Sequence, residues 1–233
     1  MDQRRTAPAP RVRMTLAERK RETREALVLA ALSAFARDGY HAASLEAIAT
    51  EAGYSKGAIY SNFAGKAELF LAVMDYNLEA LRGDGWNPLS AERAGNGRAE
   101  TAAPEEDAAM MVRGVGLATL EFIATAARDD TLTEALRARV QGMVDSYRQV
   151  AAEARGDDDA LAADDVARLM AALDQGASIL TLSGITAMDG TLLRTGLRRL
   201  LSPEHPAPES GDRGSPLPDV RRVQRLMGHP DET

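Results

Sequence analysis

The sequence predicts an all-α protein in which a small N-terminal helical domain precedes a larger helical bundle. Alanine dominates long stretches of the 233 residues, and the runs of Val, Ile and Thr that are typical of strands are absent. Apolar residues recur at helical spacing through most of residues 15–201. Aromatic residues make up only 4% of the chain, so the core is expected to be largely aliphatic.

Helix start and stop signals divide this pattern into segments. Thr15 and Glu18 fit a capping box that opens the first helix, and Asp38-Gly39 ends it. Ser44 and Ser55 are the expected N-caps of two short helices, the second of which runs to about residue 62. Further helices are expected from Gly65-Lys66, over 108–127, behind a second capping box at Thr131–Glu134, over about 164–187, and from 190 to 201.

Composition suggests four regions. Residues 1–14 hold four arginines and two prolines and are expected to be a disordered basic arm, solvated or touching DNA. Residues 15–66 form the N-terminal helical domain and residues 67–201 the larger bundle, which a flexible connection at 82–107 containing Trp86 interrupts. Residues 202–233 hold six of the ten prolines and are expected to be a disordered tail.

Composition and motif content argue against several classes of protein. The chain has no cysteine, and its three histidines (His41, His205 and His229) are far apart, so neither a metal site nor a cofactor is expected. No nucleophile motif indicates an enzyme. No apolar run approaches the ~20 residues of a membrane-spanning helix, and no signal peptide is recognisable, so a cytoplasmic protein without a membrane partner is expected.

Charge is distributed asymmetrically along the chain. The net charge of −7 argues against a general affinity for nucleic acid. Residues 1–66, however, carry 11 Lys/Arg and seven Asp/Glu, a net +4, whereas the remainder carries 17 and 28, a net −11. A basic front on an acidic body is typical of a protein that places one end against a polyanion.

The segment 44–63, SLEAIATEAGYSKGAIYSNF, has the spacing of a helix-turn-helix. Two helices that cross closely need a small residue at the crossing, here Ala49. The turn between them needs a residue that adopts positive φ, here Gly53. An apolar residue of the second helix, Ile59, then returns to the shared core. This geometry presents the second helix to a DNA major groove.

The longer run FARDGYHAASLEAIATEAGYSKGAIYSNFAGKAELF resembles the DNA-binding domain of the TetR family of transcriptional regulators. The resemblance covers about residues 20–75, a quarter of the chain. It implies a helix-turn-helix domain followed by a helical domain that binds a ligand and dimerises. The residues that carry it are Phe35, Gly39-Tyr40, Ser44, Ile48-Ala49, Ala52-Gly53, Ser55-Lys56-Gly57, Tyr60, Phe63, Lys66 and Leu69-Phe70.

The resemblance implies roles for individual residues. Ser44 and Lys66 stand at helix N-termini and are predicted to contact phosphates, and Tyr60 is predicted to contact the DNA backbone. Lys56 is the candidate donor to guanine and Asn62 the candidate partner of adenine. The face predicted to meet base edges comprises Ser55, Lys56, Gly57, Ala58, Ser61 and Asn62.

Structural roles compete with some of these assignments. Tyr60 is alternatively a packing residue, and Ser55 is alternatively only an N-cap. Lys20, Arg21 and Arg24 either reach phosphates or are solvated charges, and the sequence favours neither reading.

The C-terminal region is expected to dimerise and to bind an unidentified small molecule. Its last two helices carry more apolar surface than one core requires, which favours a symmetric homodimer. The candidate dimer residues are Leu173, Ala177, Leu180, Gly184, Leu193, Leu197 and Leu200. The candidate ligand residues are Met111, Phe122, Met143, Tyr147, Met170 and Asp174, of which the methionines favour an adaptable lipophilic pocket.

The function expected from these features is a homodimeric repressor that a small-molecule ligand releases from a palindromic operator in double-stranded DNA. Two alternatives keep the fold: a regulator that works without a ligand or as an activator, and a relative whose N-terminal domain no longer binds DNA. An enzyme is a remote alternative.

Overall fold

The computed structural model describes residues 15–82, 88–89, 105–154, 161–184 and 190–201, and these residues form helices without a strand, as predicted. The basic arm, the C-terminal tail, Trp86 and most of the 82–107 connection lie outside the described residues. The helices are α1 (Leu16–Ala42), α2 (Leu45–Glu51), α3 (Lys56–Asn62), α4 (Lys66–Arg82), α5 (Glu105–Ala126), α6 (Asp130–Ala154), α7 (Ala163–Ser183) and α8 (Gly190–Leu201).

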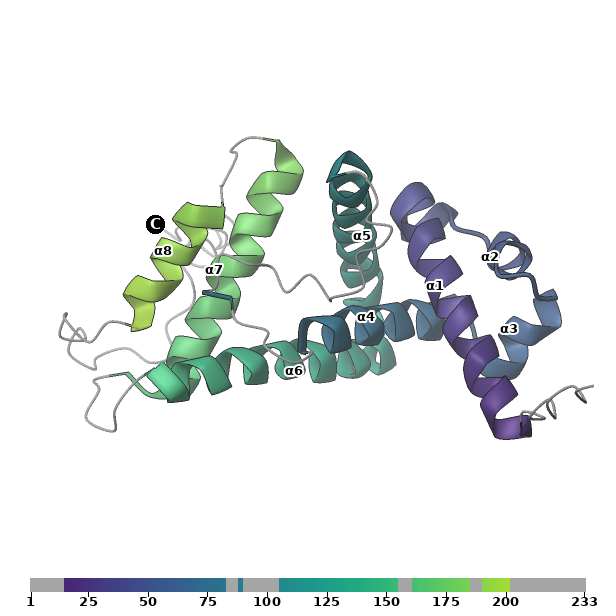
Figure 1. The fold of residues 1–233 in the computed structure, drawn as a ribbon, viewed down its shortest axis with the longest axis horizontal. Helices are drawn as coiled ribbons and strands as arrows, with labels where there is room; N and C mark the ends of the chain where they lie inside the picture. The colour runs from purple at the N-terminus through teal and green to yellow at the C-terminus, as the bar shows by residue number, and fades with distance from the viewer. Residues whose placement is uncertain (1–14, 83–87, 90–104, 155–160, 185–189, 202–233) are drawn as a thin grey trace, which may run out of the picture.

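The helices form an elongated arrangement with the two short helices at one end (Figure 1). We call α1–α4 the head and α5–α8 the body. Figure 1 shows α6 lying lengthwise along the body, α5 upright between α1 and α7, and the pair α7 and α8 at the far end. The contacts agree with this view, because α1 packs mainly on α5 and α4, while α6 packs on α7 and α4.

The ends of α1 follow the predicted signals. The Thr15 hydroxyl accepts from the Glu18 backbone N–H, and the Glu18 carboxylate accepts from the Thr15 N–H at 2.7 Å, which completes the capping box. At its other end α1 is interrupted by Gly39, whose φ of 79° and ψ of 171° are not helical. Positive φ at this position favours glycine, and a Cβ would also lie 2.8 Å from the Glu121 carboxylate of α5.

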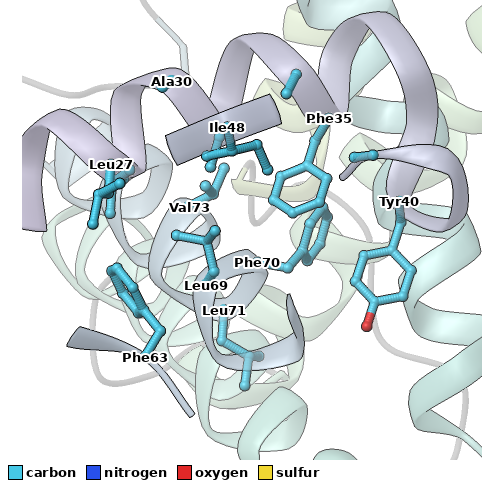
Figure 2. Packing of buried hydrophobic residues seen from close by; sticks show 14 of the residues in the cluster. Leu27, Ala30, Phe35, Tyr40, Ile48, Phe63, Leu69, Phe70, Leu71 and Val73 are labelled. Atoms are coloured by element: carbon cyan, nitrogen blue, oxygen red, sulfur yellow. The ribbon is translucent and has the colours of Figure 1, made fainter. Parts of the chain in front are cut away.

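The head is built around one buried cluster that joins all four of its helices to α5. Figure 2 shows the part of this cluster around Phe35, Tyr40 and Phe70. Phe35, Tyr40 and Phe70 form its aromatic centre together with Phe122 of α5, and neighbouring ring centroids lie 4.8–6.0 Å apart. Leu69 of α4 is also fully buried in this cluster. The core of the head therefore continues past residue 66 into α4 and α5.

A second buried cluster holds α6, α7 and α8 together. Its largest fully buried members are Met170 and Val166 of α7 and Leu197 of α8, with Tyr147 of α6 only 3% exposed. Between the two clusters, Arg139 of α6 donates to the Asp75 carboxylate of α4 at 2.6 Å. This ion pair links the head to the body.

Several predicted helix boundaries differ from the structure, and the helix expected over 108–127 begins at Glu105. The helix expected to reach residue 187 ends at Ser183, because Gly184 adopts the left-handed conformation at φ 69° and terminates it. The capping box predicted at Thr131–Glu134 does not form. Instead the Asp129 carboxylate accepts from the backbone N–H groups of Thr131 and Leu132 at 2.9 and 3.1 Å. An Asp directly before the first turn supplies the cap earlier than the Thr does.

In the part of the chain that the structure describes, no helix combines the length and the apolar character that crossing a bilayer requires.

Candidate nucleic-acid interface

The α2 and α3 helices form the predicted helix-turn-helix. Gly53 has φ 78°, and the Tyr54 N–H donates to the Ala49 carbonyl at 2.8 Å, which closes the turn. Ala49 is 1% exposed at the crossing, and Ile59 of α3 is fully buried in the head core. The side of α3 opposite Ile59 is consequently the side that faces outward.

The outward face of α3 carries most of the predicted base-reading residues. Ser55, Lys56, Gly57 and Ser61 are exposed, and Tyr60 is 55% exposed, so Tyr60 is not a packing residue. Ser55 occupies the N-cap position, but its hydroxyl makes no capping hydrogen bond. Ser55 is thus the N-cap by position, as the alternative reading has it, while its hydroxyl is not engaged in a capping hydrogen bond.

Gly57 leaves open space at the start of this face. A Cβ built on Gly57 meets only the Ser55 hydroxyl, at 3.7 Å, which is ordinary van der Waals contact. The fold itself therefore does not need glycine at this position. Another surface is therefore able to approach α3 closely at Gly57.

Lys56 is held by α2 through an exposed ion pair. Its ammonium donates to the Glu46 carboxylate at 2.9 Å, and this hydrogen bond raises the pKa of Lys56 above its ordinary value. Any base that Lys56 contacts has to share its ammonium with Glu46. Sequence reasoning missed Glu46, because no motif or periodicity distinguishes it from a solvated acidic residue of α2.

Asn62 is turned toward the protein. Its amide nitrogen donates to the Ala58 carbonyl at 2.8 Å, and its side-chain oxygen is buried without a hydrogen-bond partner. Pairing with adenine uses both atoms of the amide, so the side chain has to rotate outward first. Ala58 is half-buried beside it. Base reading by Asn62 stays a prediction.

The two predicted phosphate contacts differ in their surroundings. The Ser44 hydroxyl accepts from the Ala47 N–H at 3.5 Å and remains exposed at the start of α2. The Lys66 ammonium is half-buried and donates to the carbonyls of His41 and Ala43 at 2.6 and 3.1 Å. Lys66 therefore fastens the end of α1 to α4, and its removal would disturb the fold as well as any phosphate contact.

The predicted ligand residues fall into three places. Met143, Tyr147, Met170 and Asp174 are associated with the second cluster, where α6 meets α7. Burial, and then the neighbouring Asp174 carboxylate that accepts its hydroxyl, raise the pKa of Tyr147 far above its usual value. Phe122 is instead fully buried in the head core, and Met111 is 37% exposed on α5.

The predicted dimer residues also divide. Leu197 and Ala177 are buried within the chain, and half-buried Leu173, Leu193 and Leu200 pack against the second cluster. Leu180 is 39% exposed. Gly184 ends α7 and so does not lie on the helix face to which it was assigned.

The sequence of residues 27–73 matches the family described as "Bacterial regulatory proteins, tetR family". The chain is 43% identical over 60 residues to the HTH-type transcriptional activator FasR of Mycolicibacterium smegmatis, a match that covers 26% of this chain and 27% of FasR. It is 40% identical over 82 residues to the uncharacterized HTH-type transcriptional regulator TtgW of Pseudomonas putida, covering 35% of this chain and 60% of TtgW. The chain thus matches less than two thirds of either relative.

Among solved structures, the fold is similar to that of a putative TetR-family transcriptional regulator from Rhodococcus sp. The TM-score is 0.57 at 21% identity, and the match covers 78% of this chain and all of the other. The fatty acid degradation regulator FadR from Bacillus halodurans matches with a TM-score of 0.52 at 16% identity, over 77% of this chain and 94% of FadR. These likenesses extend the shared fold through the body. The head is therefore similar in sequence to the DNA-binding region of the TetR family of bacterial transcriptional regulators, and the body shares its fold with the solved structures.

Proposed function

We propose that the protein is a homodimeric, DNA-binding repressor that reads a palindromic operator with the outward face of α3 and is released by a small-molecule effector. The observation that carries the DNA-binding part is the helix-turn-helix itself. Its inner residues are fixed in the core of the head, while Lys56, Gly57 and Tyr60 lie exposed on one face. Such an exposed short helix suits insertion into a major groove.

The proposal is tested by selecting bound duplexes from a random DNA library with the purified full-length protein. A homodimer with one head per half-site is expected to enrich an inverted repeat whose half-sites lie about one helical turn, or a multiple of it, apart. Enrichment of a single, unrepeated site would contradict the homodimeric reading. A library that stays random after repeated rounds would contradict sequence-specific DNA binding.

The ion pair between Lys56 and Glu46 predicts an unusual gain of affinity. Replacing Glu46 with Gln removes a negative charge from the DNA-facing surface and frees Lys56. We expect DNA affinity to rise about threefold to tenfold at low salt, because a rim charge of the wrong sign is lost. Titration of a labelled duplex by fluorescence anisotropy measures this change. Glu51→Gln, at the other end of α2, is the matched control, and equal affinity of Glu46→Gln and wild type would contradict the pairing.

The proposed dimer surface is the exposed apolar part of α7 and α8. Ile179, Leu180 and Leu192 are 48, 39 and 58% exposed, which is more apolar exposure than a monomeric pair of terminal helices requires. A symmetric interface repeats each of these residues across a twofold axis, so one substitution acts twice.

The double substitution Leu180→Glu and Leu192→Glu is therefore expected to shift the protein from dimer to monomer. Sedimentation velocity at micromolar concentration measures the change. Leu16→Glu, at the start of α1 where the leucine is 83% exposed, is the control and should leave the assembly unchanged. A double variant that remains a dimer would place the interface elsewhere.

The proposed effector site lies where α6 meets α7. The half-buried Asp174 carboxylate and the adjacent thioether of Met143 offer one polar and one adaptable apolar contact. Compounds that raise the melting temperature are expected to lower affinity for the selected duplex, and Asp174→Asn is expected to weaken the response to compounds that carry a hydrogen-bond donor. If no stabilising compound changes DNA affinity, regulation without a ligand is the better reading.

A further inference from the structure

Arg24 of α1 makes two contacts to the end of α3. Its guanidinium donates to the backbone carbonyl of Asn62, the last residue of α3, at 2.7 Å. The same group lies over the ring of Phe63, with 4.1 Å between the guanidinium carbon and the ring centroid. Phe63 is 2% exposed and ends α3, and its ring lies near Leu27 in the head core (Figure 2). Arg24 thus joins the first turns of α1 to the C-terminal end of α3.

The two ends of α3 are held in different ways. At the N-terminal end the side-chain anchor is the Lys56–Glu46 pair, in which both side chains are more than half exposed. That pair is exposed and competes with any donation from Lys56 to DNA. At the C-terminal end the anchor is Arg24, which is half-buried and bonds a backbone carbonyl that no base needs. This second anchor is able to persist while the helix is bound to DNA.

The chemistry of the contact suits a fixed support. The carbonyls of the last helical turn lack partners within the helix, and a cation near them is favoured by the helix dipole. A guanidinium is planar and rigid, so it stacks on Phe63 while donating to the carbonyl, which a lysine ammonium does less well. Both contacts begin on α1, which is itself fixed by its packing on α4 and α5.

We propose that Arg24 is a positioning residue that sets the orientation of α3 for reading bases and does not neutralise a DNA phosphate. This inference rests on the proposed DNA-binding function. This role differs from both readings that the sequence left open for Arg24, which were a phosphate contact and a solvated charge. Arg24 then controls how well the protein discriminates between DNA sequences, rather than its general affinity for DNA.

The test compares two variants of the full-length protein with a control. Arg24→Met keeps an unbranched apolar side chain beside Phe63 but removes the donor and the charge. Arg24→Lys keeps a charge and a donor but loses the planar group. Arg21→Met is the control, because Arg21 is an exposed arginine of the same helix that makes none of these contacts to α3. Each protein is titrated against the duplex selected by the wild type and against a shuffled duplex of equal length, over a salt series.

For Arg24→Met we expect about tenfold weaker binding to the selected duplex, less than about twofold change on the shuffled duplex, and an unchanged salt slope. Arg24→Lys should recover part of the loss, again with an unchanged slope, and it keeps the test valid if the methionine variant folds poorly. Equal losses on both duplexes, with a salt slope smaller by about one, would show a phosphate contact and overturn the proposal. Wild-type affinity at both duplexes in Arg24→Met would overturn it as well.

Failure of the underlying function gives a different result. If the wild-type protein selects no sequence, the proposed DNA reading fails before any Arg24 variant is compared, and the role of Arg24 falls with it.

Discussion

Alanine in place of Gly114 is expected to destabilise the protein by about 3 kcal/mol or more. Gly114 of α5 lies directly against α1, and a Cβ there would overlap the backbone carbonyl oxygen of Ala36 and lie 2.7 Å from its carbonyl carbon. A backbone group cannot rotate away as a side chain does, so α1 and α5 would have to separate along the most extensive contact between the described helices. Urea denaturation followed by circular dichroism measures the loss.

Gly176→Ala of α7 is the matched control. A Cβ at Gly176 has no atom within 4 Å, so the same substitution should raise stability by about 0.5–1 kcal/mol through helix propensity alone. A Gly114→Ala variant as stable as the wild type would mean that α1 and α5 are not packed as closely as the structure shows.

Substitution of Gly57 is expected to separate stability from DNA binding. Alanine at this position fits the free protein and should raise stability by up to about 1 kcal/mol. A leucine should also be tolerated, because the position is exposed. If α3 enters a major groove at Gly57, affinity for the selected duplex should fall about tenfold for alanine and about a hundredfold for leucine, because the added atoms displace the helix from the base edges.

Melting temperature and duplex affinity, measured on the same samples, test this prediction. Loss of binding together with unchanged or raised stability cannot be explained by misfolding. Substitution of Gly57 is therefore a cleaner test of DNA binding than substitution of Lys66. Lys66→Ala removes two hydrogen bonds to backbone carbonyls and is therefore expected to lower both quantities. A leucine at position 57 that leaves duplex affinity unchanged would show that this part of α3 does not approach DNA.

Local signals explain why so much of the head follows from the sequence. Each of these signals acts on the backbone within a few residues of itself, so its effect on helix starts, helix ends and turns is predictable from the local sequence. They are the Thr15–Glu18 capping box, the glycines at 39 and 53, and the small Ala49. Where two local signals compete, the outcome depends on detail. Asp129 took the cap predicted for Thr131, and Gly184 ended a helix whose apolar pattern continues beyond it.

Contacts between distant segments could not be read from the pattern. The apolar faces of the segments that become α5 and α6 indicate burial. They do not show that Phe122 of α5 joins the head core while Tyr147 of α6 joins the second cluster. The Lys56–Glu46 pair is likewise a property of the crossing of α2 and α3. Arg24 is an intermediate case, because it precedes the buried Leu27 by one helical turn and therefore lies on the core side of α1.

The central claim is that the α2–α3 unit reads DNA sequence, and the ratio of two dissociation constants tests it most directly. The full-length protein is titrated at about 150 mM salt against the duplex it selects and against a shuffled duplex of the same composition. We predict that the selected duplex binds about 10³-fold or more tightly, and that binding to both weakens as salt rises. A ratio near one would contradict the account, because it would leave only charge attraction between a basic head and DNA.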